Sequence, residues 1–249
     1  MLTRCGATIQ PWHNGLVTTE HQRAPRREQA LSRDLIVEAT AEILDAGGEE
    51  ALTLRALTVR LATGYGAIYH HVADRRDLLA AATDHVVGRV ATGLAADAEP
   101  RQALRALALG LFDAIVAHPW VGAQLAREPW QPALLDVYER VSERLQVLGV
   151  PQRSFADAAS LLMNYILGVA GQNAANARAL AASGTDRSAF LVAVAARWAQ
   201  LDPARYPHVH QAAAQLREHD DREQFLAGID LILAGIDAAN LAGKDDAAR

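Results

Sequence analysis

The sequence predicts an all-α fold, in which a small N-terminal domain of short helices precedes a larger helical domain. Leu and Ala dominate the composition, whereas Val, Ile and aromatic residues are sparse and do not alternate along any long stretch. Apolar residues instead recur at helical spacing from residue 31 onward, and Gly or Pro separates the periodic segments. With 249 residues, 51% of them hydrophobic, the chain is long enough for two domains.

The composition also indicates where the protein works. No run of 18 uncharged apolar residues is present, and the first thirty residues lack the apolar core of a secretory signal, so we expect neither a membrane span nor export. The single cysteine, Cys5, excludes an intrachain disulfide and is typical of a reducing compartment. These features favour a cytoplasmic protein.

The charge is unevenly distributed along the chain. Residues 1–76 hold nine arginines and nine acidic residues, and the rest of the chain carries all of the net charge of −5. Residues 1–30 lack periodicity and are expected to form a flexible tail, as are residues 243–249. Arginines gather on either side of the first helices: Arg23, Arg26, Arg27, Arg33, Arg75 and Arg76. This pattern fits a small DNA-contacting head on an acidic body, although arginines scattered over a surface would give the same counts.

The first two helices carry their own start and stop signals. Helical spacing continues from residue 31 to Gly47-Gly48, which ends the helix with residues that tolerate left-handed geometry. Thr53 is placed to cap the next helix, and Leu52 can pack against Leu57 in a hydrophobic staple. One face of this short helix is apolar, through Leu54, Leu57 and Leu61.

A second short helix follows a break near Ala62-Thr63. Ile68 and Val72 define its buried side. Three side chains fall on the opposite side and are expected to be exposed: Tyr65, Tyr69 and His70. Two short helices joined by a few residues form a helix-turn-helix, whose second helix needs an exposed side that reaches bases and phosphates. For His71, a half-buried structural role is the stronger expectation.

The rest of the chain predicts only helices. Asp74, with Asp77 three residues later, caps a long helix that covers residues 77–96. Pro, Gly or an acidic cap delimits the following segments: Arg101–His118, Ala123–Arg127, Pro132–Leu148, 154–182, 187–200 and 222–242. The segment "DPARYPHVHQ" between the last two is expected to be a loop. The chain therefore divides into domains at 31–79 and 80–242.

With these segments placed, residues 31–80 resemble the DNA-binding domain of the TetR (tetracycline repressor) family of bacterial transcriptional regulators. The resemblance rests on "TLRALTVRLA" and "AIYHHVADRRDLL". The C-terminal part resembles the tetracycline-repressor branch through "LDPARYPHV" and "FLAGIDLILAGI". The resemblance implies an N-terminal three-helix helix-turn-helix domain followed by a larger helical ligand-binding and dimerisation domain. It also implies a homodimeric, ligand-responsive repressor, which a small-molecule effector releases from a palindromic operator.

Carried over position by position, the resemblance implies a set of DNA-contacting residues. Arg55 matches a position that can pair with the edge of a guanine. Arg75 matches a phosphate contact at the start of the long helix, where backbone N–H groups would add to it. The full set is Thr53, Arg55, Gly64, Tyr65, Ala67, Tyr69, His70, His71 and Arg75.

Two departures from the family pattern lie in the same region. Ala62 stands where the family often has Gly, so we expect a slightly altered turn. Gly64 and Gly66 each cost on the order of 1 kcal/mol of helix propensity relative to Ala. We therefore hypothesise that the second short helix is poorly ordered until it meets double-stranded DNA.

A dimer is expected because one short helix reads only a few base pairs. A two-fold dimer places two such helices about 34 Å apart in successive major grooves. The segments 154–182 and 222–242 are the candidates for the contact between the two copies, since each has more apolar surface than one core uses. Burial of this apolar surface in the core of a single copy is the alternative.

The family's effector pocket would lie between the segments 101–118, 132–148, 154–182 and 187–200. Six residues are candidates for its lining, although each is more often a core residue: Trp120, Trp130, Tyr138, Met163, Asn164 and Trp198. Effector binding would shift the helix at 77–96, and it can release DNA only to the extent that the effector prefers the non-binding state.

Other functional classes find little support in the residues. No Gly-x-Ser-x-Gly, His-Glu-x-x-His or phosphate-binding glycine loop is present, so we expect no enzyme activity and no cofactor. His118 and the pair His208-x-His210 lack the acidic neighbours of a metal site, and we expect no metal. A helical binding protein whose DNA-binding head has degenerated is the further alternative.

Overall fold

The computed structural model describes residues 31–93 and 98–247, with side chains up to Asn240. The predicted tail at 1–30, with its arginines and Cys5, lies outside the described residues. Every regular element within them is helical, which confirms the predicted all-α fold class. The described residues from Ser32 onward group into one compact unit, so the domain boundary at residues 79–80 stays a prediction.

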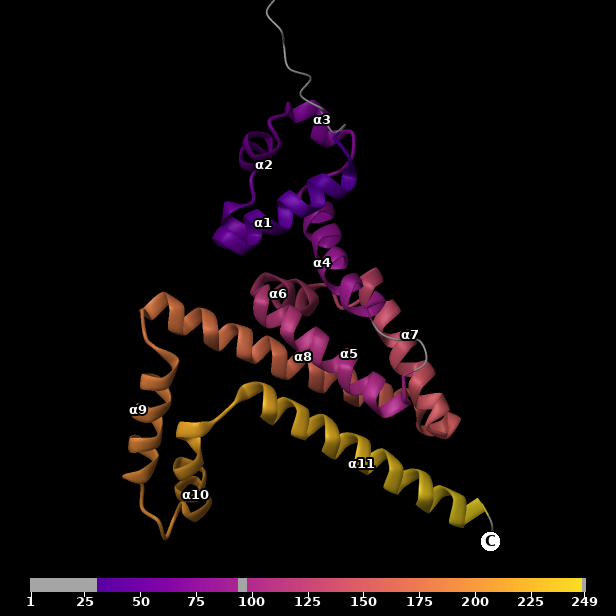
Figure 1. The fold of residues 1–249 in the computed structure, drawn as a ribbon, viewed down its shortest axis with the longest axis vertical. Coiled ribbons are helices and arrows are strands. Elements are labelled where there is room, and N and C mark those ends of the chain that lie inside the picture. Colours follow the sequence, from indigo (N-terminus) through magenta and orange to yellow (C-terminus); the bar gives the residue numbers. More distant parts are fainter. Residues whose placement is uncertain (1–30, 94–97, 248–249) are drawn as a thin grey trace, which may run out of the picture. The chain divides into compact units, whose positions relative to one another are not determined.

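Four helices make up the N-terminal part of the described chain (Figure 1): α1 Arg33–Ala51, α2 Leu54–Leu61, α3 Tyr65–Tyr69 and α4 Arg75–Thr92. Their expected caps are present. Thr53 Oγ1 accepts a hydrogen bond from the N–H of Ala56 at 3.1 Å, and Asp74 Oδ1 accepts one from the N–H of Asp77 at 2.9 Å. Gly48 interrupts the helical geometry of α1 with a φ of 67°, at the predicted glycine pair. The sequence signals therefore define these helices locally.

The turn between α2 and α3 depends on an unusual backbone conformation at Ala62. Its φ of 49° and ψ of 44° place it in the left-handed region, and it is the one non-glycine residue with positive φ among the described residues. The turn therefore has the conformation that glycine adopts at no steric cost, and an L-residue pays about 1–2 kcal/mol for it.

The larger part of the chain contains seven further α-helices within the described residues: α5 Pro100–Ala117, α6 Pro119–Arg127, α7 Pro132–Val147, α8 Gln152–Ser183, α9 Arg187–Ala199, α10 Pro207–Gln215 and α11 Asp221–Ala247. A short 3₁₀ turn, η1, covers Leu216–Glu218. α5 packs on both α8 and α11 (Figure 1), and α7 packs on α4, α5 and α8. α9 and α10 pack mainly on each other and on η1.

Several predicted boundaries are wrong. α6 begins at Pro119 rather than Ala123, and α10 lies in the segment predicted to be a loop. Both helices have proline at the first helical position, where its missing N–H costs no hydrogen bond. A proline that was expected to end a helix or to lie in a loop therefore begins a helix in each case. α4 ends at Thr92 instead of residue 96, and α11 continues to Ala247 past the predicted end at 242.

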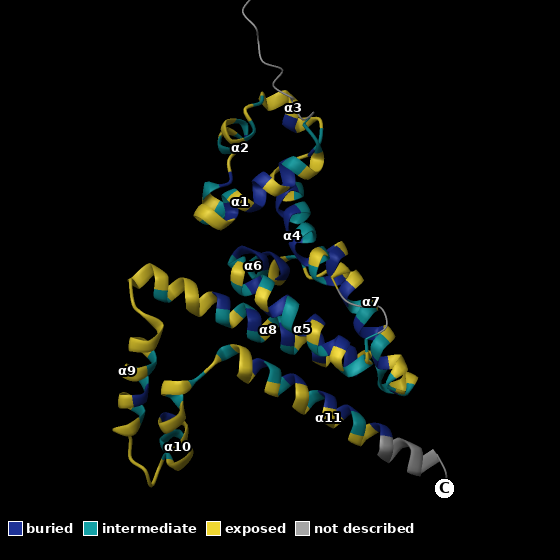
Figure 2. Cartoon of the chain, in the orientation of Figure 1, coloured by how far each residue is buried: buried dark blue, intermediate teal, exposed yellow. Residues whose placement is uncertain are grey.

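The core of the larger part forms where α5, α8 and α11 meet (Figure 2). Phe225 of α11 stacks on Phe112 of α5 with ring centroids 4.6 Å apart, and on Tyr165 of α8 at 5.5 Å. The Tyr165 hydroxyl donates a hydrogen bond to the Phe225 carbonyl at 3.1 Å. Gly228 permits this approach, because a Cβ there would lie 1.8 Å from the Tyr165 hydroxyl oxygen.

The described residues contain no single helix with the length and hydropathy to cross a membrane. The helices α5 and α6 satisfy such a test only when taken together, and they are bent by 106° at their junction.

Candidate functional sites

The exposed side of α3 carries the residues that the sequence predicted to face outward. Tyr65 and Tyr69 are each 53% exposed, and His70, Gly64 and Ala67 are also exposed. On the inner side, Ile68 is fully buried and Val72 is 3% exposed. The predicted orientation of this helix is therefore confirmed, whereas the contacts of these residues with DNA stay a prediction.

Thr53 and Arg55 extend this surface at the start of α2. Both are exposed, and the Arg55 side chain forms no ion pair within the described residues. The Thr53 hydroxyl accepts the capping hydrogen bond and so keeps its own proton for a further partner. Rings, a hydroxyl and a guanidinium are thus available on one exposed surface, which we call the α2–α3 face: Thr53, Arg55, Gly64, Tyr65, Ala67, Tyr69 and His70.

The two remaining predicted contacts, His71 and Arg75, are partly engaged within the protein. His71 is half-buried, which agrees with the expectation of a structural role for this residue. The Arg75 guanidinium donates from Nε to the Leu52 carbonyl at 3.3 Å and from Nη2 to the Glu49 carbonyl. Arg75 therefore fixes the connection between α1 and α2, and its Nη1 group has no hydrogen bond within the described residues.

Arg33, grouped above with the basic residues around the first helices, has a structural role that the sequence did not predict. Its Nη1 donates to the His71 carbonyl at 2.8 Å, and its Nη2 forms an ion pair with Asp77 Oδ1 at 2.8 Å. The hydrogen bond from Arg33, followed by one from the N–H of Ala73, holds the pKa of the Asp77 carboxyl below its ordinary value. Arg33 thus joins the start of α1 to the end of α3 and the start of α4.

Polar contacts also connect α1 with α6. Asp45 Oδ1 lies 2.7 Å from His118 Nδ1 and accepts a hydrogen bond from the Trp120 indole Nε1 at 2.7 Å. One turn further along α1, both carboxylate oxygens of Glu49 accept hydrogen bonds from Arg127. The hydrogen bond from Arg127 lowers the pKa of Glu49, against the effect of burial. Polar contacts thus connect α1 of the helix-turn-helix part to α6 and to His118, the residue directly before α6.

A cavity of about 410 Å³ lies between α5, α8, α9 and the start of α11. Its apolar lining is Phe112, Val116, Ala177, Leu180, Phe190 and Leu191, and its polar lining is Asn173, Asn176, Arg187, Asp220, Asp221 and Arg222. Its volume falls in the range of small-molecule sites. We refer to it as the α5–α9 cavity.

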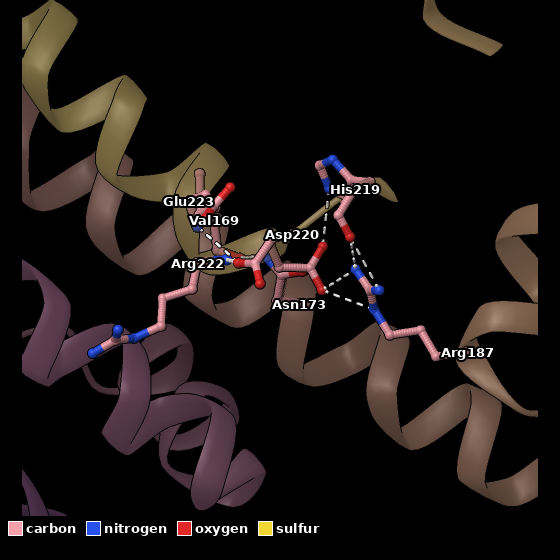
Figure 3. A network of polar contacts seen from close by, with 8 residues as sticks. Val169, Asn173, Arg187, His219, Asp220, Arg222 and Glu223 are labelled. Carbon is pink, nitrogen blue, oxygen red and sulfur yellow. Dashed lines mark hydrogen bonds and ion pairs between the residues drawn. The ribbon is translucent and has the colours of Figure 1, made fainter. Parts of the chain in front are cut away.

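The charged groups in the wall of this cavity pair with one another or with the backbone (Figure 3). Arg187 forms an ion pair with Asp221 at 2.7 Å, and Arg222 forms one with Asp113 at 3.1 Å. Asp220 Oδ1 accepts hydrogen bonds from the N–H groups of Arg222 and Glu223 at 2.8 and 2.9 Å, and the Glu223 N–H contributes most to lowering the pKa of Asp220.

The six residues predicted to line an effector pocket do not gather in the α5–α9 cavity. Trp120 and Met163 are buried, Tyr138 and Trp198 are half-buried, and Asn164 and Trp130 are exposed, the last by 82%. None of them belongs to the cavity's lining. Four of the six are aromatic, and residue type alone does not distinguish a core or surface ring from a ligand contact. Their role in binding stays a prediction.

The helices predicted to form the dimer contact are only partly covered. Part of the apolar surface of α11 is buried in the protein's own core, as in the alternative that the sequence left open. The buried residues include Phe225, Ile229, Leu233 and Ile236. A second face stays uncovered, where Leu161 of α8 is 51% exposed and Leu231 of α11 is 75% exposed. Both line a mainly apolar groove of about 570 Å³ between α8 and α11. Apolar surface for a second copy is therefore present on these helices.

Metal binding finds no cluster of ligands in the described part of the chain. No three side chains of His, Cys, Asp or Glu there gather in a way that could hold a metal ion. His118 lies against Asp45, while His210 Nε2 lies 2.5 Å from the Leu201 carbonyl.

The chain is similar to known transcriptional regulators over most of its length. Residues 96–240 match the domain family described as the tetracyclin repressor-like C-terminal domain. The solved structure of SCO7222, a TetR transcriptional regulator from Streptomyces coelicolor, is 50% identical and has a TM-score of 0.77, over 84% of this chain and 98% of that one.

Two further relatives have lower identity. The HTH-type transcriptional repressor DrrR1 of Streptomyces coeruleorubidus is 28% identical over 221 residues, which cover 86% of this chain and 81% of that protein. An HTH-type transcriptional regulator of Saccharopolyspora erythraea is 29% identical over 155 residues, 62% of this chain and 66% of that protein. The similarity thus includes both the α2–α3 face and the helices around the α5–α9 cavity.

Proposed function

Because the chain belongs to the tetracycline repressor (TetR) family of transcriptional regulators, we propose that it is a homodimeric repressor that a small-molecule effector releases from a palindromic operator. The 28% identical relative DrrR1 is itself a transcriptional repressor, which supports repression rather than activation. We place the DNA-binding head at residues 31–79 and the effector-binding and dimerisation body at residues 80–242.

The observation that carries the proposal is the exposure of the rings on α3 above a fully buried Ile68. Ile68 anchors one side of the helix, so Tyr65, Tyr69 and His70 can enter a major groove without disturbing the core. The Arg55 guanidinium forms no ion pair within the described residues, and a guanidinium can form two hydrogen bonds with guanine. Arg75 uses Nε and Nη2 within the head and has Nη1 left for a phosphate oxygen.

The groove between α8 and α11 provides the second requirement, a surface for another copy. Leu161 and Leu231 are large apolar side chains left in solvent, and burying them against the same face of a second copy would remove both from water. A two-fold arrangement of this kind would bring two α3 helices to one side of the dimer, as a palindromic site requires.

Effector release would proceed through the helices that touch both parts. α4 starts in the head at Arg75 and packs on α5, α6 and α7 of the body, while α6 holds Asp45 and Glu49 of α1. An effector that favours a different position of α6 or α4 would therefore change the distance between the two α3 helices of the dimer. This role needs neither catalysis nor a cofactor, and we propose that the protein acts in the cytoplasm, where bacterial operator DNA lies.

Operator selection from random duplexes tests the proposal directly. The purified protein should enrich a palindrome whose half-sites lie about one helical turn apart or a multiple of it. Exposed residues allow a clean control: Tyr65→Ala and His70→Ala should each weaken operator binding at least about fivefold in gel shifts, whereas His208→Ala, on α10 of the body, should not. Enrichment of no sequence, or equal affinity of all variants, would overturn the proposal.

A further inference from the structure

The α5–α9 cavity has an apolar lining that one copy of the chain leaves partly in solvent. Phe112 at its wall is buried in the stack with Phe225, which fixes its ring. Phe190, contributed by α9, is 44% exposed. Val116, Leu180 and Leu191 are only half-buried. A molecule that fills the cavity would therefore cover aromatic and aliphatic surface, which is the main source of affinity for apolar ligands.

The charged groups in the same wall are engaged in ion pairs or in hydrogen bonds with the backbone. The lining contains two arginines and two aspartates. Arg187 is engaged by the His219 carbonyl at 3.2 Å (Figure 3) and by Asp221, while Arg222 is engaged by Asp113. Asp220 caps the start of α11, so the N–H groups there that could attract an anion are already satisfied.

A charged molecule would lose hydration on entering this cavity, and each charge that it meets there is already engaged, in an ion pair or, for Asp220, in two backbone hydrogen bonds. To bind one of these groups closely, it would have to compete with the existing contacts, which leaves another polar group without its partner. Both alternatives are costly, since a desolvated charge needs a counter-charge or several hydrogen bonds. An uncharged molecule meets neither penalty.

The two uncharged polar residues of the wall are Asn173 and Asn176, and Asn173 is the more deeply buried of them. Asn173 donates from Nδ2 to the Val169 carbonyl of its own helix at 3.1 Å, which fixes the orientation of the amide. Its Oδ1 has no hydrogen-bond partner within the described residues, and the side chain is half-buried. An amide oxygen accepts hydrogen bonds and donates none, so its complement is a hydroxyl or an N–H group.

We infer that the α5–α9 cavity is the effector site and that it selects an uncharged, largely apolar molecule with a hydrogen-bond donor directed at Asn173 Oδ1. Naming this molecule an effector rests on the proposed function; the chemical class rests on the cavity wall alone. This site is formed by α5, α8, α9 and α11, and its lining contains none of the six residues predicted from the sequence.

Four naphthalenes of one size test the ligand class by calorimetry with the full-length protein at pH 7. The probes are 2-naphthol, 2-methoxynaphthalene, 2-naphthoate and 2-naphthylmethylammonium. The neutral pair should bind at least about tenfold more tightly than either ion. Naphthol should bind about three- to tenfold more tightly than methoxynaphthalene, because only naphthol donates a hydrogen bond.

Two substitutions on α8 assign this preference to the cavity. Asn173→Leu removes the acceptor at similar volume and should abolish the advantage of naphthol over methoxynaphthalene. Gln172→Leu is the matched control, because Gln172 is exposed on the same helix outside the cavity, and it should retain that advantage. Circular dichroism would show that both variants stay folded.

The possible results separate the ligand class from the proposed function. Equal or tighter binding of an ion, binding of none of the four probes, or the same loss in both variants would overturn the inference. Operator gel shifts with the same sample report on the proposed function independently, since they need no ligand. Naphthol that binds in the cavity without releasing operator would support the ligand class and refute its role as an effector site.

Discussion

Arg127 of α6 donates hydrogen bonds to both carboxylate oxygens of Glu49, near the end of α1. The backbone carbonyl of the same glutamate accepts a hydrogen bond from Arg75, whose Nε reaches the Leu52 carbonyl directly before the cap of α2. A continuous polar path therefore leads from α6 to Leu52, directly before the cap of α2. It gives α6 a physical means of influencing the head that is separate from the packing of α4.

Arg127→Gln should loosen the orientation of the head without unfolding it. The pair is partly exposed, so its loss should lower the free energy of unfolding by only about 0.5–1 kcal/mol. Operator affinity should fall severalfold, and an operator with one extra base pair between its half-sites should be tolerated better, because the head is less constrained. Gel shifts on the two operators measure both effects. Arg105→Gln, which removes the Arg105–Asp230 pair between α5 and α11, should leave the spacing preference unchanged.

The same pair predicts a dependence of stability on pH. The pKa of Glu49 is lowered in the folded protein, chiefly by the Arg127 hydrogen bond. Its stabilisation is therefore complete above the ordinary value of 4.5 and is lost as the pH falls through the folded pKa. The difference in unfolding free energy between the wild type and Arg127→Gln should shrink as the pH is lowered from 6 to about 3. A difference that stays constant in urea titrations over this range would contradict the assignment.

Asp84 should show the opposite sign. It caps the start of α7 by accepting a hydrogen bond from the Ala133 N–H at 3.1 Å, and burial raises the pKa of its carboxyl. Its contribution is thus greatest below its ordinary pKa of 3.8 and declines as the pH rises through the folded pKa. Asp84→Asn keeps an acceptor without the charge and should gain stability relative to the wild type between pH 4 and 7. Asp84→Ala should lose about 1 kcal/mol with the cap. Denaturant titrations that place both variants together would refute this account.

Two neighbouring arginines of α2 test the α2–α3 face. In the part of the chain that the structure describes, Arg55 forms no ion pair, whereas Arg60 donates hydrogen bonds to Glu42 of α1. Arg55→Ala should therefore cost about 1–3 kcal/mol of binding on the selected operator and relax specificity at one base pair. Arg60→Ala should have a much smaller effect, since its charge is already paired. Competition gel shifts with single-base operator variants provide the measurement.

The sequence predicted the head better than the body, for a physical reason. The boundaries of α2 and α4 depend on the local hydrogen bonds of Thr53 and Asp74, and such caps can be identified within a few residues. The α5–α9 cavity instead brings together Phe112 and Phe190, which are far apart in the chain. No local sequence pattern indicates that these two residues line the same cavity. The helix α10 is an intermediate case, because Pro207 at its first position was available as a signal.

Trp120 shows why residue type alone does not identify a ligand contact. The sequence made it a candidate for the pocket lining, yet the structure buries it, and its indole N–H donates a hydrogen bond to Asp45 of α1. Buried indoles generally need such a partner. The partner lies 75 positions earlier in the chain and could not be deduced from the sequence around Trp120.

Ala62→Gly tests the conformational free energy of the turn between α2 and α3. The left-handed conformation of Ala62 costs about 1–2 kcal/mol, which glycine avoids, while the greater freedom of glycine in the unfolded chain returns part of that gain. The variant should therefore be more stable by about 0.5–1 kcal/mol. Hydrogen exchange adds a second measurement over residues 63–72, where α3 is five residues long and Gly64 provides no side-chain cap. Exchange there should be fast in the free protein and slow on operator, in both the variant and the wild type. Equal protection with and without DNA would show that α3 is already formed before it binds.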